Sequence, residues 1–283
     1  MDRWFLIISG IVILSVFAVF IGQVYQRARL KKLEISLIRS ASKSKSDAID
    51  FGSFSELPLP VSRYFKHVLV DGQRLIKTVR MRQSGILRAS PMKNNWSAFT
   101  ASQLVVPSSN SFIWDAKIAM PLSTHFQVID SYVSGIGSGQ VSLFSAFPLV
   151  SESGSVELNS GALHRYLAES VWFPTNLLPQ SGVLWSPLNE HSVIATITDR
   201  GITVSLEFRF NEAGEVTGIY SPGRFSKIDG GYIQLPWEGH FSDYQQQAGM
   251  LIPMYGEVGW YIDGALQLVW KGKLLDVDYD LEA

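Results

Sequence analysis

Apolar and polar residues alternate with a period of two through most of the chain after Lys77, and this pattern most restricts how the chain can fold. The segment "ITVSLEFRF" at 202–210 places five apolar residues on one face and four polar residues on the other. Such alternation is typical of a strand with one buried face and one solvated face. Similar runs occur at 77–87, 97–106, 112–120, 125–133, 139–145, 191–199, 216–220, 235–245, 256–262, 265–271 and 273–279.

These many short strands, often separated by turn residues, predict a mainly β (α+β) fold: a curved antiparallel meander sheet or half-barrel. Two segments depart from the alternation. "LPLPVSRYFKHVL" at 57–69 and "GALHRYLAESVWF" at 161–173 place apolar residues three and four apart, which predicts a helix in each, the first opened by Pro60 and the second ending before Pro174. We expect the sheet to pack over one or two helices.

An uncharged apolar segment, "WFLIISGIVILSVFAVFIG" at 4–22, lies near the start of the chain. As a helix it would extend about 28 Å, close to the hydrocarbon thickness of a bilayer. A cleavable signal peptide is the alternative, because residues 16–18 loosely fit a small-residue cleavage site. Since the apolar run continues past that site, we favour one retained transmembrane helix in residues 1–27.

The charge is unevenly distributed along the chain. Residues 1–45 carry eight Lys and Arg against two acidic residues, whereas the remainder carries 16 basic and 23 acidic residues. An acidic body is a poor binder of nucleic acid, so we expect the partner of the basic segment to be the lipid bilayer. Because the basic residues follow the apolar segment, the positive-inside rule predicts a single-pass inner (plasma) membrane protein with a cytoplasmic body.

The rest of the chain divides into a basic juxtamembrane segment with a polar linker, 28–56, and a single β-rich domain, 57–283. The segment "RARLKKLEISLIR" at 27–39 has two interpretations. It could lie along an anionic leaflet as an amphipathic helix, or simply extend the transmembrane helix.

The segment "RYLAESVWFPTNLLP" at 165–179 places an arginine and a glutamate four residues apart among apolar and aromatic residues. In a helix, Arg165 and Glu169 lie on one face within reach of each other. The pair either fixes the helix on the sheet or supplies the polar contact of a ligand cavity lined by aromatic residues. For the second case, the expected ligand-binding residues are Arg165, Glu169, Trp172, Trp114, Trp185, Trp237, Tyr244 and Asp130.

Familiar catalytic and metal motifs do not occur in the sequence. The chain contains no cysteine, and its five histidines are scattered singly, so we expect no metal site and no cofactor. Asp130, Glu169, Glu238 and Asp243 could supply a carboxylate pair for acid–base chemistry if two of them lie close together. Whether the protein is an enzyme stays open.

Several segments, including "LPLPVSRYFKHVL", "FIWDAKI", "LHRYLAESVWFPTNLLP", "LPWEGHFSDY" and "LIPMYGEVGWYI", resemble in order an uncharacterised bacterial family known as a domain of unknown function. The resemblance covers about 57–280 and implies one N-terminal membrane helix, a basic flank and a β-rich body. The expected body is also similar to lipoprotein carriers of the LolA and LppX type, which hold acyl chains in a half-barrel. Because those carriers work outside the cytoplasm, an extracytoplasmic body is the alternative topology.

Three functions are therefore open. We favour a non-enzymatic, membrane-tethered domain that binds a hydrophobic or amphiphilic, lipid-like ligand. A membrane-bound hydrolase would require a cleft that brings Asp130 or Glu238 close to Glu169. A protein-interaction module would show a broad exposed apolar patch and no pocket. The sequence gives no indication of the oligomeric state.

Overall fold

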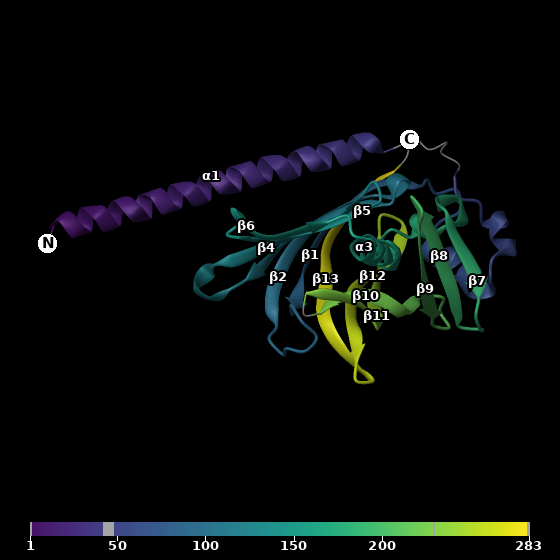
Figure 1. Ribbon diagram of the computed structural model, residues 1–283. Helices are drawn as coiled ribbons and strands as arrows, with labels where there is room; N and C mark the ends of the chain where they lie inside the picture. The colour runs from purple at the N-terminus through teal and green to yellow at the C-terminus, as the bar shows by residue number, and fades with distance from the viewer. Residues whose placement is uncertain (1, 42–47, 229, 282–283) are drawn as a thin grey trace.

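The computed structural model describes residues 2–41, 48–228 and 230–281. Its strands form one antiparallel sheet, strongly curved into a half-barrel (Figure 1). They are β1 (Ile76–Leu87), β2 (Ser97–Val106), β3 (Ser111–Ala119), β4 (His125–Val133), β5 (Ile136–Leu143), β6 (Phe147–Ser153), β7 (Val183–Pro187), β8 (Ser192–Asp199), β9 (Ile202–Phe210), β10 (Val216–Ile228), β11 (Gly231–Gln247), β12 (Met250–Ile262) and β13 (Ala265–Leu281).

The chain enters the sheet in the middle, runs outward to one edge, and returns to the middle from the other edge. From β1 the chain meanders to the edge strand β6, crosses to the opposite edge strand β7, and meanders back to β13, which pairs with β1. The crossing segment contains helix α3 (Val156–Glu169) and three short 3-10 turns. The seam between β1 and β13 therefore joins two meanders in the middle of one sheet.

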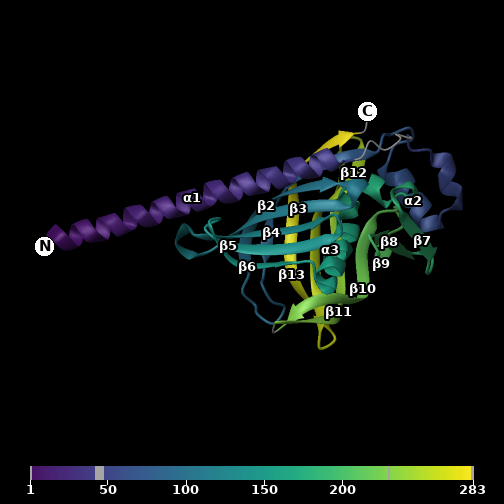
Figure 2. The ribbon, with the colours of Figure 1, turned by 45° about the horizontal axis from the view of Figure 1, so that its top comes forward.

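Helices cover both faces of the sheet. Helix α3 and helix α2 (Leu59–Val68) lie on the concave face, where Tyr166 and Phe65 are fully buried in the main core. The second half of helix α1 (Asp2–Ser40) lies on the convex face of β2 to β5, because its Leu37 packs with Leu104 and Ile113 in a separate cluster. Figure 2 shows the first half of α1 extending away from the sheet.

Helix α1 is continuous through residue 27 and includes the basic segment 27–39. It is the one helix among the described residues that is long and apolar enough to cross a membrane, and its apolar window is not buried in the protein. The structure thus shows the basic segment as an extension of this helix, the simpler of the two interpretations. Part of the expected polar linker, 42–47, lies outside the described residues.

The predicted fold class is confirmed: the fold is mainly β, with a curved antiparallel sheet over helices and a long apolar N-terminal helix. Both predicted body helices occur, although α3 begins five residues earlier than expected, where Ser155 caps it by accepting a hydrogen bond from Leu158 N. Two details of the strand prediction were wrong. The predicted strands 265–271 and 273–279 form one strand, β13, and β6 and β7 were missed.

The two missed strands lack the alternation on which the prediction rested. All but one residue of β6 is exposed, so its apolar residues do not mark one buried face. Strand β7 has five residues and ends in a proline. Both are edge strands of the sheet, where a side chain has a packing partner on one side only and sequence periodicity weakens.

Candidate functional site

Helix α3 positions the central arginine of the site over the concave face of the sheet. Its buried stripe of Leu163, Tyr166 and Leu167 packs into the main core, and this orients Arg165 and Glu169 toward the strands β2 to β4. After Glu169 the helix tightens into a 3-10 turn that ends at Trp172. The indole N–H of Trp172 donates to the backbone carbonyl of Pro253 at 3.0 Å, which fixes the ring against β12.

The guanidinium of Arg165 binds two carboxylates. Its Nε donates to Glu169 Oε1 at 2.7 Å, and its Nη1 donates to Asp130 Oδ2 on β4 at 3.0 Å. The same group lies over the rings of Trp114 and Phe112, with its Cζ 4.8 and 5.2 Å from their centroids. Ion pairing at its edge and cation–π contacts at its face hold this cation in one place.

A chain of hydrogen bonds extends from Glu169 into the sheet. Gln103 donates to Glu169 Oε2 at 2.6 Å, Gln83 donates to Gln103 at 3.1 Å, and the indole of Trp114 donates to Gln83 at 2.8 Å. Gln83, Gln103 and Trp114 are buried. Since each buried polar group here has a partner, the network positions Glu169 and the Trp114 ring together.

A second arginine, Arg224 on β10, completes the cluster. It donates from Nε and Nη2 to the carbonyl of Gly161 at 3.2 and 2.8 Å, and its Cζ lies 4.5 Å from the ring centroid of Trp237 and 5.1 Å from that of Trp260. No ion pair joins it to a carboxylate of the described residues. Burial, followed by repulsion from Arg165, lowers the pKa of Arg224 to about 10.

The four charged groups influence one another. Burial raises the pKa of the Asp130 carboxyl above its ordinary value, although Arg165 acts in the opposite direction. Burial would lower the pKa of Arg165, but Glu169 and Asp130 outweigh it and raise that pKa. The cluster therefore keeps Arg165 charged, while Arg224 is a half-buried cation whose charge is balanced at a distance by Glu169 and Asp130.

These residues line a cavity of about 440 Å³ between α3 and the concave face of the sheet. Its wall is mainly apolar and aromatic, and its polar groups come from the charged cluster, Glu257 and Arg88. The lining residues are Leu87, Arg88, Ala89, Trp114, Ile118, Val128, Asp130, Arg165, Ala168, Glu169, Trp172, Arg224, Trp237, Phe241, Gly256, Glu257, Val258, Val269 and Trp270.

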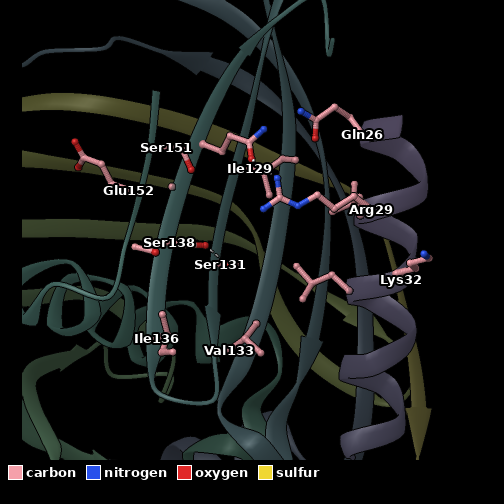
Figure 3. Close-up of a pocket in the computed structure, with 15 residues that line it drawn as sticks. Gln26, Arg29, Lys32, Ile129, Ser131, Val133, Ile136, Ser138, Ser151 and Glu152 are labelled. Carbon is pink, nitrogen blue, oxygen red and sulfur yellow. Dashed lines mark hydrogen bonds between the residues drawn. The ribbon is translucent and has the colours of Figure 1, made fainter. Parts of the chain in front are cut away.

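A second hollow, of about 580 Å³, lies on the other face of the sheet, between α1 and strands β4 to β6. Figure 3 shows α1 running alongside the strands, with Arg29 extending toward them. Arg29 donates to Gln140 on β5 at 3.3 Å. The serines on the strand side, Ser131 and Ser138, bond to each other at 2.7 Å.

The sequence profile of the family of unknown function DUF6920 matches residues 55–279, most of the chain. The chain belongs to this family. No curated protein matches the chain. The DUF6920 family has no known activity that could assign roles to the residues described above.

Solved structures similar to this DUF6920 protein include a lipoprotein-sorting protein. An outer membrane lipoprotein-sorting protein domain from Vibrio parahaemolyticus has 10% identity and a TM-score of 0.40, over 71% of this chain and 85% of that one. A LolA superfamily protein from Nitrosomonas europaea has 10% identity and a TM-score of 0.41, over 82% and 94%. At TM-scores below 0.5, neither likeness identifies what the DUF6920 protein binds.

Six of the eight sequence-predicted site residues of this DUF6920 protein line the cavity together: Arg165, Glu169, Trp172, Trp114, Trp237 and Asp130. Trp185 and Tyr244 lie elsewhere in the core. Trp185 donates to the carbonyl of Leu177 and packs edge-on against Phe208, and Tyr244 donates to the carbonyl of Val216. Both rings are partly buried and pack against the main core, and neither lines this cavity.

Sequence reasoning missed Arg224 and Trp270, which also line the cavity. Trp270 lies in the predicted strand 265–271, where it alternates with Leu266 and Leu268. This shared face was the signal in the sequence that could have placed Trp270 toward the cavity. Nothing local marks Arg224, because its role comes from the pairing of β10 with β11 and the approach of α3 from a distant part of the chain. Glu238, considered for a carboxylate pair, is bound instead by Arg209, His240 and Tyr261 outside the cavity.

Proposed function

We propose that this protein is a membrane-tethered domain that holds a hydrophobic or amphiphilic, lipid-like ligand in the cavity between α3 and the sheet. The observation that carries the proposal is the composition of this cavity: tryptophans 114, 172, 237 and 270 line it together with three arginines, 88, 165 and 224. Its volume of about 440 Å³ lies within the range of about 300–1,000 Å³ that is common for small-molecule sites.

The charged cluster suits the polar end of such a ligand. Arg165 is held by two carboxylates, whereas the one acceptor of Arg224 among the described residues is a backbone carbonyl, and its Cζ lies over two indole rings. A phosphate or carboxylate group would give Arg224 the anionic partner that the described residues do not supply, and guanidinium groups bind both anions well. The apolar wall would enclose the hydrocarbon part.

We further propose that α1 is retained as a single-pass anchor and that the body is cytoplasmic. The arginines and lysines of α1 cluster after its apolar part, as the positive-inside rule requires for this orientation. Protease added to intact cells should leave the body intact, and protease added after lysis should digest it. Digestion of the body in osmotically shocked cells, whose inner membrane stays sealed, would place the body outside the cytoplasm.

Lipid mass spectrometry on the full chain, extracted in a mild detergent, tests the binding proposal. The wild-type protein should retain a lipid-like molecule in near-stoichiometric amount. Val128→Trp would fill the cavity, because Val128 lines it, and should abolish this retention. Val70→Trp, the same change at an exposed position after α2, should retain as much as the wild type. Equal retention by both variants would show that any lipid is held elsewhere.

A hydrolase is the second candidate, favoured by one observation. Asp130 and Glu169 both bind Arg165 inside the cavity, so a carboxyl with a raised pKa lies near a second carboxylate. If the protein hydrolyses its ligand, Asp130→Asn and Glu169→Gln should each abolish release of fatty acid or headgroup from the lipids found bound. Retention of unchanged lipid by the wild type over the same period would support binding alone.

A further inference from the structure

The membrane helix meets the body at one defined place. Gly22, the last residue of the apolar segment, lies so close to β5–β6 that a Cβ there would be 2.8 Å from the Cβ of Ala146. One residue later, Gln23 donates from Nε2 to the carbonyl of Phe144 at 2.8 Å. The turn between β5 and β6 therefore lies where α1 would leave the hydrocarbon region of a bilayer.

The strand that follows this turn carries apolar side chains that the body leaves exposed. Phe147, Leu149 and Val150 on the edge strand β6 are 42, 56 and 51% exposed. The neighbouring turn between β3 and β4 adds Leu122, which is 94% exposed. We call Leu122, Phe147, Leu149 and Val150 the apolar rim. Several exposed large apolar side chains at one end of a sheet are unusual on a surface that faces only water.

The two turns are joined to each other. Phe144 N donates to the carbonyl of His125 at 3.1 Å, and His125 Nε2 lies 2.8 Å from Ser145 Oγ. In the β3–β4 turn, Leu122 adopts a left-handed backbone with φ of 59°, a conformation that costs a residue with a Cβ energy and favours glycine or asparagine. A leucine that is both strained and almost fully exposed contributes nothing to the stability of the body in water.

Polar groups follow the rim at the distance expected for lipid headgroups. Along α1, Arg29 lies seven residues beyond Gly22, roughly 10 Å at 1.5 Å per residue. Along β5, its partner Gln140 lies three residues before Leu143, again roughly 10 Å at 3.3 Å per residue. Along both the helix and the strand, an apolar part is thus followed at the same distance by polar groups. These polar groups belong to the basic and serine-lined hollow of Figure 3.

We propose that the apolar rim inserts into the same bilayer that α1 crosses, which gives the body a second membrane contact. The partner is a lipid surface rather than another protein, because the rim continues directly from the membrane-spanning part of α1 and basic residues follow at headgroup depth. The contact orients the body on the membrane. The cavity between α3 and the sheet reaches the same end of the strands, since Leu87 and Ile118 at the ends of β1 and β3 line it.

Depth-dependent fluorescence quenching tests this proposal on the full chain, which contains no cysteine. Single variants Leu122→Cys and Phe147→Cys, labelled with an environment-sensitive dye, are placed in nanodiscs of phosphatidylcholine and phosphatidylglycerol, with and without spin-labelled lipid. Both labels should show blue-shifted emission and strong quenching by the spin-labelled lipid. The substituted positions are exposed, so the changes leave the core packing intact.

Two controls separate insertion from mere proximity to the anchor. Ser153→Cys lies on the same strand as Phe147 but roughly 20 Å away and should be quenched weakly. Leu184→Cys on the opposite edge strand, where the side chain is 68% exposed, should match a water-exposed dye. Quenching at 122 and 147 no stronger than at 153 would overturn the proposal. The result does not depend on whether the cavity binds a lipid.

Discussion

Arg165 is fixed both by its charge and by its shape. Its edge binds Asp130 and Glu169 while its face lies over Trp114 and Phe112, and the side chain is only 20% exposed. A lysine at this position would keep the charge but lose the second carboxylate and the flat contact. The residue therefore both locks α3 onto the sheet and shapes the cavity.

Replacing Arg165 by leucine should destabilise the protein strongly. The change leaves two carboxylates in a partly buried site without their cation, which costs about 3–5 kcal/mol in comparable cases. Urea unfolding in detergent, followed by tryptophan fluorescence, measures the difference. Lys77→Met, which breaks the exposed pair with Asp280, should cost less than about 1 kcal/mol. Similar losses for both variants would show that Arg165 is not buried in solution.

His164 should make the protein less stable in acid. It is 7% exposed, and burial, followed by repulsion from Arg224, lowers its pKa to about 4. As the pH falls from about 6.5 toward 4, the unfolded chain takes up a proton at this residue and the folded chain does not. The folded state thus loses stability across that window, by up to about 3 kcal/mol.

The variant His164→Gln isolates this effect, because glutamine does not titrate. Unfolding midpoints in urea at several pH values between 7.5 and 4.5 should fall more steeply for the wild type than for the variant. Asp130, whose pKa is raised, titrates in both proteins and acts in the opposite direction. Parallel profiles for the two proteins would mean that His164 takes up its proton at the same pH in the folded and the unfolded chain.

At the scale of elements, the sequence predicted the helices and most strands from periodicity alone. Strand β9, with alternating buried and exposed residues, matches its predicted range. The edge strand β6 does not show the pattern because its side chains are exposed on both faces. Its exposed apolar residues are informative only when the position of α1 is known, and the sequence does not show where α1 packs.

Helix α1 should be displaced from the sheet by a side chain at Gly22. A Cβ at this position would be 2.8 Å from the Cβ and 3.0 Å from the carbonyl oxygen of Ala146, closer than such atoms normally approach. In a background with Arg29→Cys and Gln140→Cys, whose native side chains meet, Gly22→Leu should reduce the yield of a short cross-link. Gly10→Leu should leave the yield unchanged, since nothing lies within 4 Å of Gly10. An unchanged yield with Gly22→Leu would refute this packing.

At the scale of the whole molecule, the site depends on contacts that no local pattern reveals. Arg165 and Glu169 could be paired from their spacing, and Asp130 was expected in the same cavity. Their position around one cavity with Arg224 requires the crossing from β6 to β7, which carries α3 over the middle of the sheet. The aromatic count indicated a cavity wall, but which tryptophans face it depends on curvature and register.

The seam between β1 and β13 should be sensitive to a single methyl group. A Cβ at Gly85 would collide with the carbonyl of Lys271 and lie 2.8 Å from the Cα of Gly272 on β13. Gly85→Ala should therefore lower the free energy of unfolding by about 1–3 kcal/mol, as overpacking does. Gly231→Ala, where only one atom lies 3.9 Å away, is the control. Equal denaturation midpoints for the two variants would show that the seam can open to accommodate the methyl group.

The pairing of β1 with β13 also determines when the two halves of the sheet can join during translation. Residues from Trp270 to Leu281 must be synthesised before the pairing of β13 with β1 is complete. During that time the first meander, from β1 to β6, lies next to the membrane helix with the inner edge of β1 unpaired. Unpaired edges favour incorrect association, so rapid translation of the second meander, or a chaperone that covers β1, would protect the nascent chain.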